Sequence, residues 1–204
     1  MITALTGRDL AVKRGERLLF EGLDFDVRAG GAVVVTGPNG AGKTSLIRAV
    51  AGLIAPVQGR IGFHGPAGPI EPDEARRAGC HLIGHQDGLK GARAAREELL
   101  FWTRWTGGGA ASAHRAAVLL GLERILPLEV RLLSAGQRRR LALARLIAAP
   151  RSLWLLDEPF VSLDGAARAT LQEILRRHLE EGGMVFAASH EPLPVAAQIL
   201  ELGR

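Results

Sequence analysis

A glycine-rich turn at residues 37–44, Gly-Pro-Asn-Gly-Ala-Gly-Lys-Thr, constrains the fold of this chain more than any other feature. It follows the apolar run Ala32–Thr36, which is typical of a strand buried on both faces. It precedes a predicted helix over Thr44–Leu53, whose apolar residues fall on one stripe: Leu46, Ile47, Val50 and Leu53. A turn of the pattern G-x-x-x-x-G-K-[ST] between a strand and a helix predicts a phosphate loop in an α/β fold.

Each residue type in this turn suits the triphosphate tail of a nucleotide. Glycines let the backbone curl so that its N–H groups point at phosphate oxygens, and the helix that begins near Lys43 adds its positive end. Lys43 would reach the β- and γ-phosphates, and the Thr44 hydroxyl would bind Mg²⁺. We therefore expect ATP and Mg²⁺ as cofactors. The expected nucleotide contacts are Gly37, Pro38, Asn39, Gly40, Ala41, Gly42, Lys43, Thr44 and Ser45. The alternative, a glycine turn that binds nothing, is disfavoured by the strand and helix on either side.

A second strand ends in two acids. The apolar run Leu153–Leu156 leads into Asp157, Glu158 and Pro159. The carboxyl end of a buried parallel strand lies at the sheet edge where α/β proteins bind ligands. Asp157 would hold Mg²⁺ through its water shell, and Glu158 would orient or deprotonate the attacking water. Such a run is common by itself, and it is the upstream phosphate loop that favours the catalytic interpretation.

A second helix start is suited to an anion. Leu133-Ser-Ala-Gly-Gln137 precedes a predicted helix over Arg138–Ala149. Ser134 is a good N-cap, and Gly136 permits close approach of a ligand to the backbone. An ordinary capped helix would explain the same residues, so this segment alone does not define a site.

The remaining pattern indicates one domain over 1–204. Residues 2–36 are predicted to form strands, with Leu23, Phe25 and Val27 alternating with two aspartates. Further buried strands are expected at 153–156 and 184–188, which implies a mostly parallel sheet. Loops are expected at Gly65–Pro72 and Gly107–Ala113, and helices at 92–106, 114–121 and 165–181. We expect an α/β core of 1–87 and 136–204, with a helical subdomain over about 88–135.

Composition limits the possible partners. The net charge of +5 comes from scattered residues, 23 of the 26 basic ones being arginine, which does not indicate a nucleic-acid surface. No apolar run is long enough for a transmembrane helix, and because the first twenty residues are charged we expect no signal peptide. The lone cysteine, Cys80, fits a reducing compartment. Cys80, His81 and His85 lack the spacing of covalent haem attachment, so we expect structural roles for them.

Residues 133–137, LSAGQ, resemble the signature sequence of the ATP-binding-cassette (ABC) ATPases. The other motifs of that family are similar and stand in its order. Gln86 resembles the glutamine of the Q-loop, Ser162-Leu163-Asp164 the D-loop, and His190 the switch histidine. The resemblance implies that Gln86 contacts metal and water and that His190 reaches the γ-phosphate. It also implies a structural role for Arg140.

The same resemblance implies two kinds of partner. ABC cassettes pair head to tail, so Ser134, Gly136 and Gln137 of a second copy would close over each ATP. An integral membrane permease subunit would couple to the pair. One residue departs from the family, because Arg14 stands where an aromatic side chain usually stacks on adenine. A guanidinium can stack on a base, though less well, so we expect weaker discrimination between bases.

Three runs resemble the ATP-binding subunits of cytochrome c biogenesis complexes, also called haem exporter ATPases. They are residues 84–90, 133–146 and 182–194. That likeness implies haem-handling cytochrome c maturation proteins as partners and a peripheral position on the cytoplasmic face of the inner membrane. Either haem or a haem-loaded chaperone would be the species handled. The alternatives are another small ABC exporter and a non-transport ABC ATPase that acts on nucleic acid. The second alternative is disfavoured, since residues 43–134 leave no room for a coiled coil or a second cassette.

Overall fold

The computed structural model describes residues 1–203, and the chain forms two compact units. The first, called here the sheet unit, comprises Met1–His85, Arg151–Pro159 and Leu175–Arg204. The second, called the helical unit, comprises Gln86–Pro150 and Phe160–Ile174. Residues 88–135, the predicted helical subdomain, lie within the helical unit, which continues beyond them.

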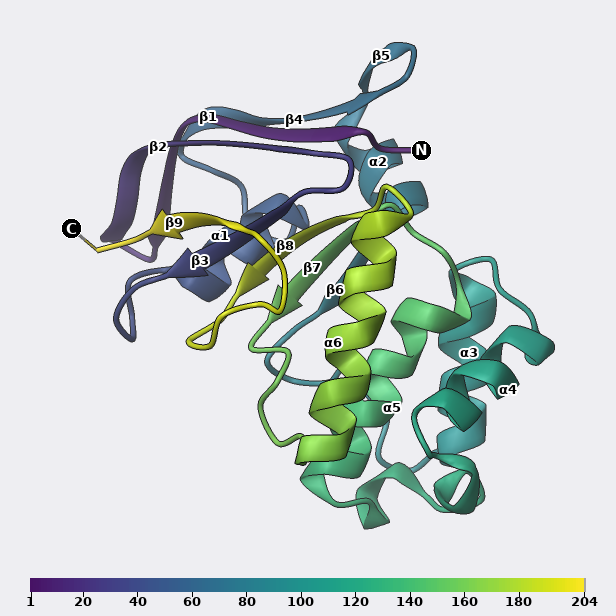
Figure 1. The fold of residues 1–204 in the computed structure, drawn as a ribbon. Helices are drawn as coiled ribbons and strands as arrows, with labels where there is room; N and C mark the ends of the chain where they lie inside the picture. Colours follow the sequence, from purple (N-terminus) through teal and green to yellow (C-terminus); the bar gives the residue numbers. More distant parts are fainter. Residues whose placement is uncertain (204) are drawn as a thin grey trace. The chain divides into compact units, whose positions relative to one another are not determined.

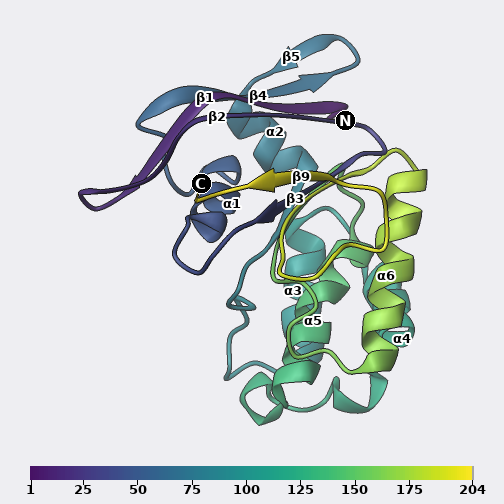
Figure 2. The ribbon, with the colours of Figure 1, turned by 60° about the vertical axis from the view of Figure 1, so that its left-hand side comes forward.

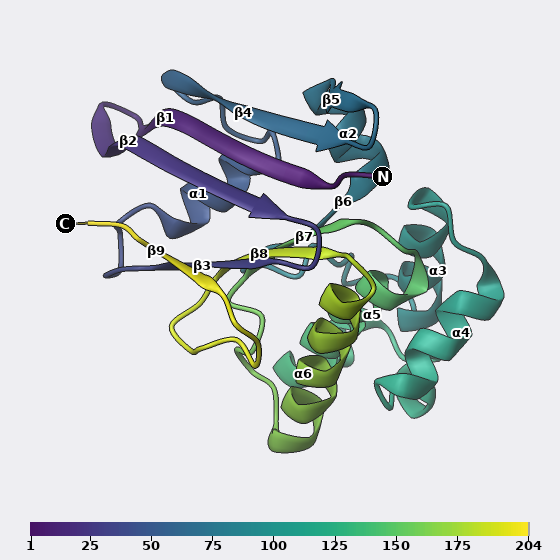
Figure 3. The same ribbon diagram turned by 45° about the horizontal axis from the view of Figure 1, so that its top comes forward.

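The sheet unit contains an antiparallel sheet with the order β2-β1-β4-β5 (Figure 3). Its strands are β1 (Ala4–Arg14), β2 (Arg17–Arg28), β4 (Gln58–Gly65) and β5 (Gly68–Ile70). Phe25 and Val27 are buried while Asp24 is exposed, as the alternation predicts. The prediction of a loop over Gly65–Pro72 is wrong in its centre, since β5 pairs with β4 there as a short hairpin.

A second, parallel sheet has the order β6-β7-β8-β3-β9 (Figure 1). Its strands are β3 (Ala32–Thr36), β6 (Cys80–Ile83), β7 (Leu153–Asp157), β8 (Met184–Ala188) and β9 (Gln198–Glu201). Every pairing in this sheet is parallel. The expected strands at 32–36, 153–156 and 184–188 are confirmed. Because the strands are parallel, their carboxyl ends meet at one edge of the sheet.

Helix α1 (Lys43–Val50) follows the phosphate loop, and α2 (Pro72–Gly79) precedes β6. Leu46, Ile47 and Val50 are buried, as predicted. The helix ends before Leu53, whose side chain is 65% exposed. The prediction that Leu53 belongs to the buried apolar stripe of this helix is therefore wrong. Gly52 is left-handed, and the Leu53 N–H donates to the Arg48 carbonyl, which together close the helix with a Schellman motif.

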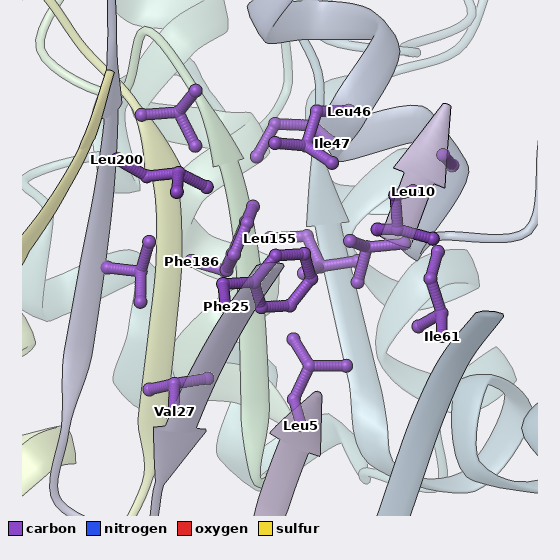
Figure 4. Packing of buried hydrophobic residues seen from close by; sticks show 14 of the residues in the cluster. Leu5, Leu10, Phe25, Val27, Leu46, Ile47, Ile61, Leu155, Phe186 and Leu200 are labelled. Carbon is purple, nitrogen blue, oxygen red and sulfur yellow. The ribbon is translucent and has the colours of Figure 1, made fainter. Parts of the chain in front are cut away.

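The core of the sheet unit lies between the two sheets and α1 (Figure 4). The Phe25 and Phe186 rings, one from each sheet, have centroids 4.8 Å apart. Leu46 and Ile47 contribute from α1, and Leu5 and Ile61 from the antiparallel sheet. Packing at both faces of the parallel sheet explains why its strands read as continuous apolar runs.

The helical unit is built on α3 (Ala95–Trp105), α4 (Ala110–Leu119) and α5 (Ala135–Ala148), which pack side by side (Figure 2). Two short 3₁₀ turns, Glu123–Ile125 and Val130–Leu132, connect α4 to α5. The loop expected over Gly107–Ala113 is wrong from Ala110 onward. There the Ser112 hydroxyl accepts the Gly109 N–H, and the alanines that follow favour helix.

Helix α6 (Gly165–Glu180) has residues in both units and agrees with the helix predicted over 165–181. Asp164 starts it, because its carboxylate accepts the Ala167 N–H at 2.8 Å. Leu171, Leu175 and Leu179 are buried as expected, while Ile174 is only half-buried. Within residues 1–203, no helix has both the length and the apolar character that a membrane span requires.

Candidate nucleotide site

The phosphate loop leaves β3 in a conformation that requires glycine at its first position. Gly37 has φ 134°, and a Cβ there would lie 2.3 Å from the Leu202 carbonyl oxygen. Leu202 is brought close because its N–H donates to the Thr36 carbonyl at the end of β3. The contact with Leu202 therefore requires glycine at position 37, whether or not a ligand is bound.

Lys43 lies inside the loop. Its Nζ donates to the carbonyls of Gly37 (2.7 Å) and Pro38 (3.2 Å), and the residue is only 8% exposed. An ammonium has three protons, so two loop contacts leave one for another acceptor. The positive charge of the Lys43 ammonium is thus held at the N-terminus of α1. Gly42 is the N-cap of α1 and provides no side-chain acceptor for the first-turn N–H groups, which suits an anion.

The two acids at the end of β7 have different surroundings. Asp157 is the last residue of the strand and is 3% exposed. Glu158 follows with a left-handed φ of 49°, and its N–H donates to the Ala188 carbonyl at 2.9 Å. The left-handed turn at Glu158 therefore holds its backbone against the end of β8.

The structure brings Glu158 and His190 together. His190 Nε2 lies 3.5 Å from Glu158 Oε1, and the His190 backbone N–H donates to Glu158 Oε2 at 3.4 Å. The contact follows from topology, since β7 and β8 are neighbours and each residue comes just after its strand. The phosphate loop follows β3, on the other side of β8, so all three groups lie at one edge.

Arg14 ends β1 at an exposed hairpin and pairs in register with Arg17. The second strand of this hairpin touches the phosphate loop, because a Cβ on Gly42 would lie 3.1 Å from both Leu19 Cβ and the Phe20 ring. The hairpin is therefore attached to the loop through β2. That attachment places Arg14 on the element that flanks the expected nucleotide.

In the helical unit, Ser134 is the N-cap of α5, as predicted. Its hydroxyl accepts the Gln137 N–H at 3.2 Å, and Gln137 Oε1 accepts the Ser134 N–H at 2.8 Å, which forms a capping box. Gln137 thus has a structural role besides the expected nucleotide contact. Gln86 is exposed at the beginning of this unit.

Gly136 has a role that the sequence reasoning missed. A Cβ at this position would lie 2.7 Å from the Ser162 carbonyl oxygen, in the segment resembling the D-loop. Ser162 is itself left-handed, with φ 64°. The signature glycine is therefore required by packing within one chain, before any ligand is considered. The local sequence does not signal this contact, because it joins residues that are far apart in the chain.

Sequence reasoning also missed Asp87, next to Gln86. Its carboxylate accepts from Arg139 at 3.0 Å, and its carbonyl accepts from Arg145 at 2.8 Å. Of the arginine run, Arg140 has a different contact, since it donates to the Leu120 carbonyl at the end of α4 (3.1 Å). The signals available in the sequence were an acid directly after Gln86 and several arginines on the helix predicted after Gln137.

Cys80 and His81 lie on opposite faces of β6, as expected of a strand. Burial raises the pKa of the Cys80 thiol to about 12, so it carries no thiolate at neutral pH. Over residues 1–203, His, Cys, Asp and Glu side chains form no group of three suited to a metal ion. The His81 side chain is buried, and Cys80 is partly buried.

The fold and the site define an ATP-binding cassette ATPase of the phosphate-loop class. The family model described as "ABC transporter" matches residues 20–161. Two solved structures show the same fold. One is a putative ABC transporter ATP-binding protein from Pyrococcus furiosus, with a TM-score of 0.82, 22% identity and 98% coverage of both chains. The other is the cassette MJ0796, solved as a dimer bound to ADP and Pi, with a TM-score of 0.81, 21% identity, and coverage of 97% of this chain and 94% of that chain.

Curated relatives are closer in sequence. The cytochrome c biogenesis ATP-binding export protein CcmA of Rhodopseudomonas palustris is 48% identical over 199 residues, which covers 98% of each chain. The protein with the same description from Nitrobacter winogradskyi is 44% identical over 199 residues with the same coverage. The chain belongs to the ABC transporter family, and within it to the cytochrome c biogenesis ATP-binding export proteins.

Proposed function

We propose that this ATPase subunit energises a membrane complex of cytochrome c biogenesis and uses the residues described above. Family membership makes it a nucleotide-binding ATPase. One observation supports the residue assignments. The same edge of the parallel sheet carries Lys43 within its glycine loop, the buried Asp157 carboxylate, and the contact between Glu158 and His190.

Lys43 and the loop N–H groups from Gly37 to Ser45 bind the triphosphate tail in this proposal. The residues that would hold Mg²⁺ are Thr44 through its hydroxyl, Asp157 through its carboxylate and Gln86 through its amide oxygen, all hard oxygen ligands of the kind that this ion prefers. A carboxylate 3% exposed at the edge of a sheet fits such an ion. When bound, Mg²⁺ neutralises charge that builds up on the β- and γ-phosphates.

Glu158 acts as the base in the hydrolytic step. Water attacks the γ-phosphorus, its proton passes to a Glu158 carboxylate oxygen, and the bond to the ADP oxygen breaks. His190 has two functions here. It orients Glu158 through the contacts at 3.5 and 3.4 Å. In the proposal, its exposed ring would also contact a γ-phosphate oxygen. Asp157 has a different role as a metal ligand in this proposal, so the adjacent acids have separate functions.

A second copy of the chain completes each site in the proposal. One phosphate loop presents donors to one side of the nucleotide, and the partner copy's signature would present donors to the other. Ser134 already accepts a hydrogen bond as an N-cap, but a hydroxyl that accepts can also donate its proton to phosphate. Gly136 and Gln137 lie in the same first turn of α5.

The proposed partners beyond that second copy are an integral membrane permease and haem-handling cytochrome c maturation proteins. Relatives described as export proteins for cytochrome c biogenesis support this choice. The chain would then be peripheral, held at the inner membrane by the permease, and would need no nucleic acid.

Two measurements test the proposal. Calorimetry with Mg–ATP should detect binding that is lost in Lys43→Ala, whereas an unaltered chain without affinity for Mg–ATP would refute the site. Affinity purification from solubilised membranes should recover an integral membrane protein together with haem-handling proteins. Recovery of an unrelated permease would favour another ABC exporter, and recovery of RNA or DNA would favour the non-transport alternative.

A further inference from the structure

A short segment after Gln86 is tied to α5 through buried arginines. Asp87 Oδ1 lies 3.0 Å from Arg139 Nη1, and the Asp87 carbonyl accepts from Arg145 Nη2 at 2.8 Å. The arginines are 4% and 6% exposed. All three residues belong to the helical unit, so these contacts lie within one compact body.

The other end of the segment is held by Glu98 of α3, which is 1% exposed. Its carboxylate accepts from the Lys90 N–H (3.3 Å), from Arg93 (3.4 Å) and from the Trp102 indole N–H (3.0 Å). Arg145 then lies over the Trp102 ring, with its guanidinium carbon 4.7 Å from the ring centroid. Asp87 and Glu98 therefore anchor residues 87–93 to α5 and α3 respectively.

The charges in this network depend on one another. Burial lowers the pKa of Arg145 to about 10, with Asp87 and Glu98 opposing that shift and Arg139 adding to it. Arg145 still carries its proton at neutral pH. Without the carboxylate of Asp87, two buried guanidinium groups on one helix would lose the anion that they share, which is strongly unfavourable in a protein interior.

We propose that Asp87 is a positioning residue that sets the place of Gln86 relative to the signature at the start of α5. Arg139 lies five residues after Ser134 on the same helix, about 7.5 Å along its axis, so a rigid helix carries the constraint from Asp87 to the Ser134 cap. The inference rests on the proposed function, in which Gln86 contacts the metal and Ser134 and Gly136 contact the partner's nucleotide.

The proposal makes the Asp87–Arg139 pair a link between two elements that handle ATP, and a displacement of Gln86 would move the signature with it. A link of this kind affects catalysis without touching the nucleotide. It should therefore change the rate of hydrolysis and leave the first binding step alone, because the phosphate loop belongs to the sheet unit.

Asp87→Asn keeps the shape of the side chain and removes its charge, and Arg139→Gln removes the partner. Arg131→Gln is the matched control, because Arg131 and Glu129 form an ion pair at 2.6 Å in the same unit with both side chains exposed (69% and 41%). Asp87→Glu is the conservative variant, which retains the carboxylate.

Amide hydrogen exchange decides the structural part of the proposal and needs no partner protein. In Asp87→Asn, we expect residues 134–138 to exchange at least about tenfold faster than in the unaltered chain, with the control and the sheet unit unchanged. Unchanged exchange at 134–138 would overturn the inference. The same loss of protection spread over both units would also overturn it, because that is general destabilisation.

Kinetics decide the functional part. We expect the affinity of Asp87→Asn for Mg–ATP to stay within about twofold, while kcat of the chain with its membrane partner falls about tenfold or more and Asp87→Glu restores most of it. Equal losses in binding and in kcat would contradict a positioning role. Absence of Mg–ATP binding by the unaltered chain would instead refute the proposed function, and the exchange result would remain interpretable.

Discussion

The contact between Gly136 and Ser162 gives the sharpest prediction about stability. In Gly136→Ala the new Cβ would lie 2.7 Å from the Ser162 carbonyl oxygen, whereas ordinary contacts begin near 3.4 Å. The two segments must therefore separate by about 0.7 Å, the difference between those distances. Ser162 already has a left-handed φ of 64°, so its backbone has little freedom to yield.

The magnitude follows from two opposing terms. Replacing glycine by alanine inside a helix stabilises it by about 0.5–1 kcal/mol. Forcing one extra carbon into a packed position typically costs about 1–3 kcal/mol. The two terms leave a net loss of up to about 2.5 kcal/mol, which for a chain of this size lowers Tm by up to about 10 °C.

Gly165→Ala is the matched control, since Gly165 begins α6 in the same unit and a Cβ there meets nothing within 4 Å. That variant should be neutral or slightly stabilised in the same thermal melt. Calorimetry should show Mg–ATP binding by both variants, because neither residue belongs to the phosphate loop. A Gly136→Ala chain as stable as the Gly165→Ala chain would refute the argument that packing requires glycine at 136.

Three further predictions concern chemistry and pH. Glu158→Gln should retain Mg–ATP binding, reduce turnover at least about 100-fold and accumulate an ATP-bound dimer on size exclusion; undiminished turnover would exclude Glu158 as the base. Since Arg14 replaces an aromatic residue, GTP and ATP should be hydrolysed at comparable rates, and a strong preference for ATP would contradict its proposed place beside the base. The His178 ring is stacked on Trp154 with centroids 3.7 Å apart, and burial lowers its pKa from 6.5 to about 4. Between these pH values the unfolded chain binds more protons than the folded chain, so the free energy of unfolding should fall as pH drops from about 6.5 to 4. His178→Leu should flatten that slope, measured by urea unfolding, and an unchanged slope would show that another group titrates.

Much of the fold was predictable because its signals are local. The runs at 32–36, 153–156 and 184–188 are apolar throughout, as strands buried on both faces must be, and all three are strands of the parallel sheet. The errors are also local in origin. The apolar stripe predicted to end at Leu53 was too long because Gly52 adopts a left-handed conformation that closes α1. The loop predicted over Gly107–Ala113 was too long because the Ser112 hydroxyl caps a helix there.

The amino-acid sequence by itself determined the phosphate loop, the paired acids after a strand and the capped signature helix, because each is written in consecutive residues. Only the tertiary structure decided which of these residues meet. Glu158 and His190 are 32 positions apart, and Asp87 and Arg139 are 52 apart. Such contacts depend on strand order and helix packing, which arise from the burial of the whole core and are not encoded in any short pattern.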